Sequence, residues 1–232
     1  MMKGVVMRER KSLKVITRAA LMLCAAFALL VFSPIVSKAE GNPGFYSKES
    51  TLLLYKGSGA NYYSLSNIKD GDKISASSSN KDIATARVQK YTAAGRSFQS
   101  VVITPKKVGT TTVTCTVKRG GKSFKSTMKV TVIKYKNPLK SFKYAGTEYA
   151  KQLNERPSYY IKKMKKEGKV SVTANSEWKI VQIFTYSNKT GKGKDWKNNK
   201  NVSTKGMTQL SVRVQNKKNK NLYITVHLSF GQ

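Results

Sequence analysis

The feature that most constrains the fold is a strict alternation of side chains in the stretch TTTVTCTVK, residues 110–118. Apolar residues alternate there with threonine, so one face of an extended chain carries Val113, Cys115 and Val117. A period of two built from β-branched residues predicts a half-buried β-strand, because successive side chains of a strand point to opposite faces. The sequence therefore favours a sheet with one buried face.

Short segments of the same kind recur at regular spacing on both sides of this strand. They predict seven strands, at residues 51–55, 62–66, 74–77, 83–89, 98–104, 110–118 and 124–133. Gly120 and Gly121 separate the last two strands and predict a tight hairpin, because paired glycines supply the positive φ angles that such turns need. No segment has a convincing 3.6-residue period, and seven short strands with turn signals indicate a β-sandwich.

Two pieces of this region carry a motif. Residues 77–85 read SSSNKDIAT, and residues 103–117 read ITPKKVGTTTVTCTV. Together they resemble the group 2 bacterial immunoglobulin-like (Big) domain, which occurs in invasin- and intimin-like adhesins and in secreted Gram-positive proteins. The resemblance covers roughly residues 45–134 and implies an immunoglobulin-like scaffold without naming an activity. The matched positions are Ser78, Ser79, Asn80, Ile83, Ala84, Lys107, Gly109, Thr110 and Val113.

The first 39 residues have the composition of a secretory signal peptide. A basic segment precedes the apolar run 19–32, and Ser37 and Ala39 occupy the two small-residue positions before a cleavage site after Ala39. The alternative is an uncleaved membrane anchor, but the apolar stretch is marginal in length and Pro34 interrupts it. Leu23 precedes Cys24 where a lipoprotein signal would have a small residue, so we do not expect lipidation.

The rest of the chain, residues 40–232, is strongly basic. It holds 37 Lys and Arg against 10 Asp and Glu, and 32 of the 37 basic residues are lysine. Lysine is a hydrated point charge, whereas arginine makes planar bidentate contacts, so the composition favours diffuse attraction to polyanions. The equally weighted alternative is that the lysines keep a β-rich surface soluble and protect strand edges.

The sequence divides residues 40–232 into two domains. Asn137 and Pro138 end a segment, KYKNP, that breaks any continuing strand, so we predict one domain over 40–134 and a second over 135–232. The second domain has strand patterns at 141–144, 169–173, 178–186, 210–215 and 222–230, separated by polar hairpins at 187–200 and 216–220. The predicted fold is thus all-β, with two tandem immunoglobulin-like β-sandwiches after an N-terminal signal peptide.

The sequence offers little for catalysis or metal binding. Cys115 is the only cysteine after the signal, so no intramolecular disulfide can form, and its place on the apolar face predicts a buried thiol. One histidine, His227, and one cysteine cannot assemble a zinc site of nitrogen and sulfur ligands. Asp70 and Asp72 are interpreted as a turn, because no further carboxylates follow at calcium-loop spacing. We therefore predict a protein that is not an enzyme and needs no cofactor.

Binding is better supported, at two clusters of aromatic and basic residues in the second domain. Trp196 lies in a Lys-, Gly- and Asn-rich segment, where its ring could stack on a sugar, although covering the sandwich is the preferred role. Tyr159 and Tyr160 precede a lysine-rich stretch. The candidate ligand-binding residues are Trp196, Tyr159, Tyr160, Lys162, Lys163, Lys194 and Lys197.

These observations predict a secreted or cell-surface protein of a Gram-positive bacterium, adhesive or binding an anionic wall polymer or glycan. The alternatives are a structural spacer or assembly component without a ligand, and a protein that binds extracellular DNA or matrix. Export and the absence of nucleic-acid-binding signatures argue against an intracellular nucleic-acid partner. Membrane contact is expected only through the signal peptide before cleavage.

Overall fold

The computed structural model describes residues 41–93 and 96–230, so the predicted signal peptide lies outside the described residues. Among the described residues, no helix is long and apolar enough to span a membrane. The described chain divides into two compact units, the first ending at Tyr135 and the second beginning at Lys136. Each unit is described by itself below.

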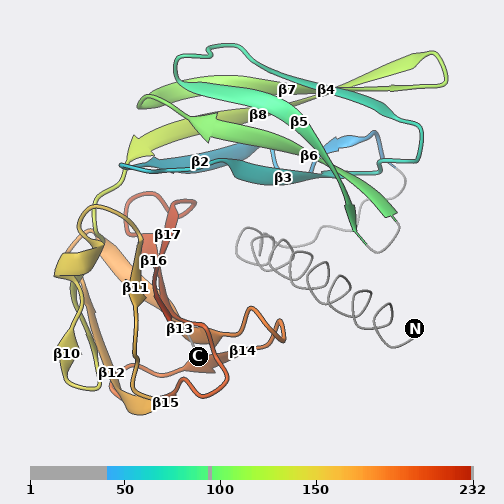
Figure 1. Ribbon diagram of the computed structural model, residues 1–232. Coiled ribbons are helices and arrows are strands. Elements are labelled where there is room, and N and C mark those ends of the chain that lie inside the picture. Colours follow the sequence, from blue (N-terminus) through green and yellow to red (C-terminus); the bar gives the residue numbers. More distant parts are fainter. Residues whose placement is uncertain (1–40, 94–95, 231–232) are drawn as a thin grey trace, which may run out of the picture. The chain divides into compact units, whose positions relative to one another are not determined.

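The first unit consists of two four-stranded sheets (Figure 1). One sheet has the order β1 (Gly44–Phe45), β3 (Asn61–Ser66), β6 (Arg96–Pro105) and β5 (Ala84–Ala93). The other has the order β2 (Glu49–Leu54), β8 (Lys122–Lys134), β7 (Gly109–Arg119) and β4 (Lys73–Ser78). All pairs are antiparallel except β2, which runs parallel to β8. This is the strand order of an immunoglobulin-like sandwich whose first strand is split between the two sheets.

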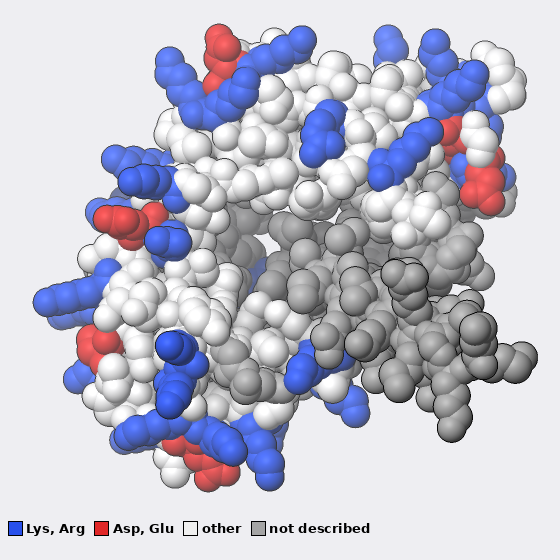
Figure 2. All heavy atoms as spheres, viewed as in Figure 1, with Lys and Arg blue, Asp and Glu red and all other residues white. Residues whose placement is uncertain are grey.

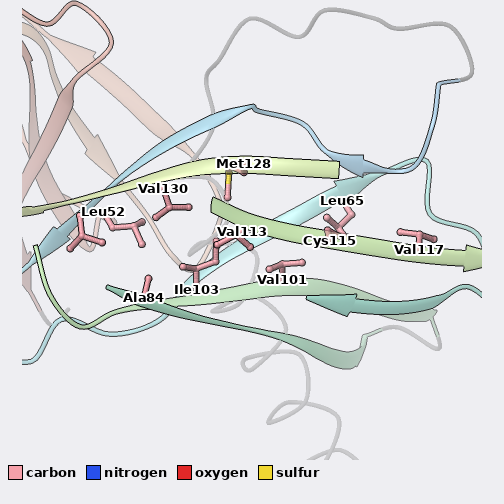
Figure 3. Packing of buried hydrophobic residues seen from close by; sticks show 11 residues of the cluster. Leu52, Leu65, Ala84, Val101, Ile103, Val113, Cys115, Val117, Met128 and Val130 are labelled. Carbon is pink, nitrogen blue, oxygen red and sulfur yellow. The ribbon is translucent and has the colours of Figure 1, made fainter. Parts of the chain in front are cut away.

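The core of the first unit lies between its sheets, and the alternation predicted for β7 is confirmed. Val113, Cys115 and Val117 are each fully buried, and Figure 3 shows them in succession along the strand. They pack in one cluster with residues of the opposite sheet, including Val101 and Ile103 of β6. Sheets whose inner faces interdigitate in this way bury their β-branched residues together, and this burial is the main term that stabilises the fold.

The two pieces of the sequence motif meet in the structure around one buried hydroxyl. Thr111 Oγ1 lies 2.9 Å from Ser78 Oγ and 3.0 Å from Ser79 Oγ, and it accepts a hydrogen bond of 3.0 Å from the Asn80 N–H. The Thr112 N–H in turn donates to Ser79 Oγ at 3.0 Å. The motif therefore fastens the turn after β4 to strand β7.

Gly109 lies at the same junction, where the start of β7 packs against Ile83 in the turn after β4. Its φ of 150° lies in the region that favours glycine, and a Cβ there would come within 2.9 Å of the Ile83 side chain. The backbone carbonyl of Ile83 accepts hydrogen bonds from the N–H groups of Lys106 and Lys107. The motif residues thus have structural roles in this unit.

Replacing Cys115 with serine is expected to lower the free energy of unfolding of the first unit by about 1–3 kcal/mol, because a hydroxyl without a partner enters an apolar layer. Burial raises the pKa of the Cys115 thiol to about 11, so it stays protonated and unreactive in the folded protein. Chemical denaturation of residues 40–232 measures the first effect. Fast labelling of the native wild-type thiol by a maleimide would contradict the burial.

The second unit is also a two-layered sandwich. One sheet has the order β10 (Thr147–Glu148), β9 (Leu139–Tyr144), β12 (Glu167–Ala174) and β15 (Asn201–Ser203). The other has the order β11 (Ser158–Ile161), β17 (Tyr223–Phe230), β16 (Gln209–Asn216), β13 (Trp178–Tyr186) and β14 (Gly193–Trp196). A short 3-10 helix, η1 (Lys151–Leu153), follows β10. As in the first unit, an early strand, β11, pairs in parallel with the last strand, β17.

The strand order confirms the predicted all-β fold with two immunoglobulin-like sandwiches. The alternation of β17 is also as predicted, with Ile224, Val226, Leu228 and Phe230 buried. The polar hairpin predicted over 187–200 requires correction, because β14 lies within it and pairs with β13. The short strands β11 and β15 were not predicted, since they hold four and three residues and carry little periodic signal.

Glu148 fastens the beginning of the second unit. Its carboxylate accepts hydrogen bonds from the Ser141 hydroxyl and from the backbone N–H groups of Phe142, Tyr149 and Ala150. Burial acts to raise the pKa of Glu148, but these four hydrogen bonds outweigh it and lower the pKa below its ordinary value. The side chain thereby joins β9 to the segment that leads into η1.

Candidate functional site

Trp196, on the edge strand β14, has one side of its ring system turned toward the sandwich. It stands opposite the buried Ile183 of β13, and its Nε1 donates a hydrogen bond of 3.0 Å to the hydroxyl of Thr185, which is also buried. Lys194 Nζ lies 4.3 Å from the centre of the indole ring, within cation–π range. Trp196 is half-buried, so the ring combines a packing role with a partly accessible face.

The neighbours of Trp196 differ in their surroundings. Lys194 and Lys197 are both exposed. Asp195 points to the other face of β14, where its carboxylate accepts a hydrogen bond of 2.8 Å from the Gln182 side chain. Lys194 and Trp196 therefore form the aromatic–basic pair at this edge.

Tyr159 and Tyr160 lie on β11, where adjacent residues point to opposite faces of the sheet. Tyr159 pairs in register with the buried Leu228 and Tyr160 with Ser229 of β17. The ring of Tyr159 packs 6.5 Å from that of Tyr149, whereas Tyr160 is 62% exposed. The two tyrosines therefore do not present one shared aromatic surface.

The structure also separates these tyrosines from Trp196. β11 and β14 are the two edges of the same five-stranded sheet. Four strand spacings divide them, a distance of about 19 Å. The predicted aromatic residues thus belong to separate surfaces.

Lys162 and Lys163 lie in a third place, at one end of the second sandwich, where three loops meet. These are the loop 162–166 between β11 and β12, the hairpin 187–192 between β13 and β14, and the loop 204–208 between β15 and β16. We call this surface the lysine-rich end. All its lysines are exposed: Lys162, Lys163, Lys165, Lys166, Lys189, Lys192 and Lys205.

Buried hydroxyl groups hold the loop 162–166 in place. The Lys165 carbonyl accepts hydrogen bonds of 2.9 Å from both the Tyr144 hydroxyl and the Thr204 hydroxyl. The Thr204 backbone N–H donates to the Lys166 carbonyl at 2.7 Å. Tyr144 and Thr204 are almost completely buried, so the backbone that carries these lysines is attached to the core.

Thr208 attaches the other two loops to each other. Its backbone N–H donates to the Tyr186 carbonyl at 2.8 Å, and its hydroxyl accepts a hydrogen bond of 3.0 Å from the Asn188 N–H. Its carbonyl accepts from the Phe230 N–H at 3.0 Å. The lysine-rich end is therefore one connected surface.

Six of the seven lysines at this end carry a positive charge that no carboxylate of the described residues neutralises in an ion pair. Within the described part of the chain, no carboxylate forms an ion pair with Lys162, Lys163, Lys165, Lys166, Lys192 or Lys205. Glu167 is the neighbouring exposed acid, at the start of β12. Figure 2 shows basic side chains spread over the face in view and few acidic ones. Such an excess creates a positive field that attracts anions.

Lys192 and Lys205 were missed as site residues, because they are far in sequence from Lys162 and Lys163. The signal that could have found them is topological: the loops after β11, β13 and β15 fall at the same end once the strands are paired.

The described residues offer few side chains for a metal site or for acid–base catalysis. They contain no group of three His, Cys, Asp or Glu side chains that could hold a metal ion. His227 stands on β17 in register with Ser158 and Ser211. Asp72, interpreted from the sequence as part of a plain turn, has a tertiary role as well, because it forms an ion pair with Arg119 at 2.6 Å.

Comparisons with known proteins give no family. No protein-family model matches the chain, and no curated protein matches it. Among solved structures, the chain is similar to the extracellular cadherin domains 1–4 of protocadherin gamma B7, at TM-score 0.31 and 10% identity over 82% of this chain and 51% of that one.

Two further structures are similar at the same level. Domains 4–9 of the surface layer protein SbsC match at TM-score 0.32 and 13% identity, over 84% of this chain and 32% of that one. The fibronectin(III)-like modules of CbhA from Clostridium thermocellum match at TM-score 0.30 and 14% identity, over 82% and 94%. The chain spans about half or less of the protocadherin and surface-layer structures. Because these TM-scores lie below 0.5, the assignment of an immunoglobulin-like fold rests on the strand order.

Proposed function

We propose that residues 40–232 form an exported, non-enzymatic immunoglobulin-like module that binds an anionic polymer of a bacterial cell envelope. The observation that carries this proposal is the lysine-rich end, where three connected loops present exposed lysines, six of which (Lys162, Lys163, Lys165, Lys166, Lys192 and Lys205) form no ion pair with a carboxylate of the described chain. Lysine is a point-charge binder of phosphate, and a row of ammonium groups suits a repeating anion more than a single shaped ligand.

The first unit is proposed to be a group 2 bacterial immunoglobulin-like domain. The matched residues Ser78, Ser79 and Asn80 meet Thr111 in one hydrogen-bond network, and Gly109 packs against Ile83. A sequence motif that identifies a fold is expected to stabilise that fold, and the two pieces of this motif contact each other at one junction. We also propose secretion from a Gram-positive bacterium, on the basis of the composition of residues 1–39 and of the family resemblance.

The proposal predicts a binding affinity that depends steeply on salt. Residues 40–232 are titrated calorimetrically with a synthetic poly(glycerol phosphate) oligomer at low and at physiological ionic strength. Each phosphate contact that is neutralised releases counterions and adds about one unit to the slope of log K against log salt. The variant Lys162→Gln, Lys163→Gln, Lys165→Gln, Lys166→Gln is therefore expected to lose most of that slope.

A matched control removes four lysines from the first unit, at Lys48, Lys56, Lys125 and Lys129, and leaves the lysine-rich end intact. It should keep most of the affinity. Equal losses in both variants would mean that net charge alone attracts the polymer. No binding at low salt would favour the spacer interpretation, and tighter binding of duplex DNA than of the oligomer would favour extracellular DNA as the ligand.

The variant Trp196→Ala tests whether stacking on a sugar contributes to binding separately from the attraction between the lysines and the polymer. Loss of stacking would weaken binding of a glycosylated polymer while leaving the salt slope unchanged, because the indole carries no charge. A changed slope would instead mean that Trp196 acts by positioning Lys194, whose ammonium group lies over the ring.

A further inference from the structure

The outward face of the five-stranded sheet in the second unit is nearly free of lysine. The five strands contain two lysines, Lys179 and Lys194, although lysine accounts for 32 residues of the chain after the predicted signal peptide. Lys194 stands opposite the buried Thr185, so it lies on the core side of the sheet. The charged residues of these strands on the outward face are Lys179, Arg213 and Asp195. Two positive charges and one negative leave this face close to neutral, so it does not suit a polyanion.

Aromatic rings alternate with small or amide side chains on this outward face. One row across the sheet holds Phe184 of β13, Ser211 of β16 and His227 of β17, which stand directly opposite one another in register. Residues in directly opposite positions of paired strands share a face. The next row, two residues along each strand, holds Tyr186, Gln209, Ser229 and Tyr160. Rings and hydrogen-bonding groups are therefore interleaved over four neighbouring strands.

Two polar groups of these rows are buried without a hydrogen-bond partner. Ser211 is fully buried and Gln209 is 9% exposed, and among the described residues neither the Ser211 hydroxyl nor the Gln209 side-chain carbonyl has a partner. Both side chains point outward, because the alternate residues Leu210 and Val212 enter the core. A buried polar group without a partner destabilises the fold. A ligand that carries hydroxyl groups and lies on this face would supply the missing partners.

His227 contributes a neutral hydrogen-bonding ring. It is half-buried, and burial lowers the pKa of its imidazole below the ordinary value, so the ring is uncharged at neutral pH. The residues opposite it in register are Ser158 of β11 and Ser211 of β16, and neither is ionisable. A neutral imidazole has one donor and one acceptor nitrogen, which suits a hydroxyl group because a hydroxyl also donates and accepts.

The other end of the outward face has the same chemistry. Tyr223 is 42% exposed, and the guanidinium of Arg213 lies 4.7 Å from the centre of its ring. The side-chain amide of Gln215 donates a hydrogen bond to the Tyr223 hydroxyl. Gln209 and Gln215 are six residues apart on β16, which corresponds to about 20 Å along the strand. A face of this length suits a chain of sugars more than a single sugar.

We propose that the outward face, centred on Gln209, Ser211 and His227, binds an uncharged oligosaccharide. The C–H groups on the face of a sugar ring pack on aromatic rings, and the hydroxyl groups at its edge pair with amides, hydroxyls and imidazole. Tyr186 and Gln209 border the loops of the lysine-rich end. The ligand is nevertheless uncharged, so this site does not depend on the proposed function.

The test is a titration of residues 40–232 with uncharged tetrasaccharides of N-acetylglucosamine, of β-linked glucose and of α-linked glucose, followed by NMR. At least one of them should shift the signals of the Gln209 side-chain amide and of the His227 ring. The affinity should be the same at low and at physiological salt, because binding of an uncharged ligand releases no counterions. An affinity that falls steeply with salt would contradict the proposal.

Ser211→Ala separates a binding role from a structural one. The variant removes a buried hydroxyl that has no partner among the described residues, so the melting temperature of the second unit should stay the same or rise. Binding of the tetrasaccharide should weaken by about two- to tenfold, which corresponds to the loss of one hydrogen bond. A purely structural role would not weaken binding in a variant that is at least as stable as the wild type.

Tyr160→Ala tests the aromatic contribution at a position that is 62% exposed, where the fold should tolerate the change. It should also weaken binding. Tyr46→Ala, at a 72% exposed position of the first unit, is the matched control and should bind as the wild type does. Trp196→Ala should do the same, because Trp196 stands opposite the buried Ile183 on the core side of the sheet.

The absence of binding by all three tetrasaccharides would overturn the proposal, as would wild-type affinity in both Ser211→Ala and Tyr160→Ala. A dimer of residues 40–232 in sedimentation that Tyr160→Ala dissociates would also overturn it, because a second copy of the chain would then cover the face. The variant with four lysines removed from the lysine-rich end should bind the tetrasaccharide normally. Failure of the polymer proposal and failure of this one are therefore distinguishable.

Discussion

Replacing Phe142 with alanine is expected to lower the free energy of unfolding of the second unit by about 3–5 kcal/mol. Phe142 lies on β9, is fully buried, and stands opposite Val172 of β12 in the centre of the sandwich. Removing its ring loses the transfer free energy of the buried atoms and leaves a cavity that a β-sandwich core cannot fill.

Calorimetric unfolding of residues 40–232 measures this effect and also tests whether each unit unfolds by itself. Each unit has its own core, so Phe142→Ala should move the transition of the second unit and leave the first in place. Val113→Ala, in the core of the first unit, is the matched control and should move the other transition. A single transition that shifts equally in both variants would show that the two units unfold together.

The strands that the sequence predicted well are those whose pattern is both long and half-buried. In β7 and β17 every second residue enters the core. Shifting such a strand by one residue would expose its whole apolar face, so the pattern determines both the strand and its register. The short edge strands β11, β14 and β15 form because a longer strand beside them offers hydrogen bonds. That stabilisation comes from a partner distant in sequence, so local patterns could not predict them.

The candidate site was predicted less well, for a geometric reason. Proximity along the chain suggested that Tyr159 and Tyr160 act together, but adjacent residues in a strand point to opposite faces. The lysine-rich end depends instead on which loops the strand pairing brings to one end. The excess of lysine could be read from the composition. The gathering of lysines on three loops held together by Thr204 and Thr208 could not, because it depends on contacts between distant segments.

The Asp72–Arg119 pair illustrates the same limit. Asp72 looked like an ordinary turn residue because its partner lies 47 positions away. Arg119 lies between the predicted strand 110–118 and the paired glycines of the hairpin, so nothing local marked it as a partner of Asp72. Their contact became visible once β4 and β7 were paired.

Glu148 should contribute strongly to the stability of the second unit, because its carboxylate accepts several hydrogen bonds. Glu148→Ala is expected to lower the free energy of unfolding by about 2–4 kcal/mol, because it leaves the backbone N–H groups of Phe142 and Ala150 and the Ser141 hydroxyl without their acceptor. Glu155→Ala, which removes an exposed acid near η1, is the control and should change stability by less than about 0.5 kcal/mol.

The contribution of Glu148 should also depend on pH in a defined direction. Its folded-state pKa is lowered below 4.5, so the folded protein binds its proton less readily than the unfolded chain does. The stabilisation is therefore fully present above the unfolded-state pKa and is lost as the pH falls through the lower folded-state pKa. Denaturation of wild type and Glu148→Gln from neutral to acidic pH should give a stability difference that shrinks below about pH 4. A difference that stays constant, or grows on acidification, would mean that the carboxylate is not held ionised by these hydrogen bonds.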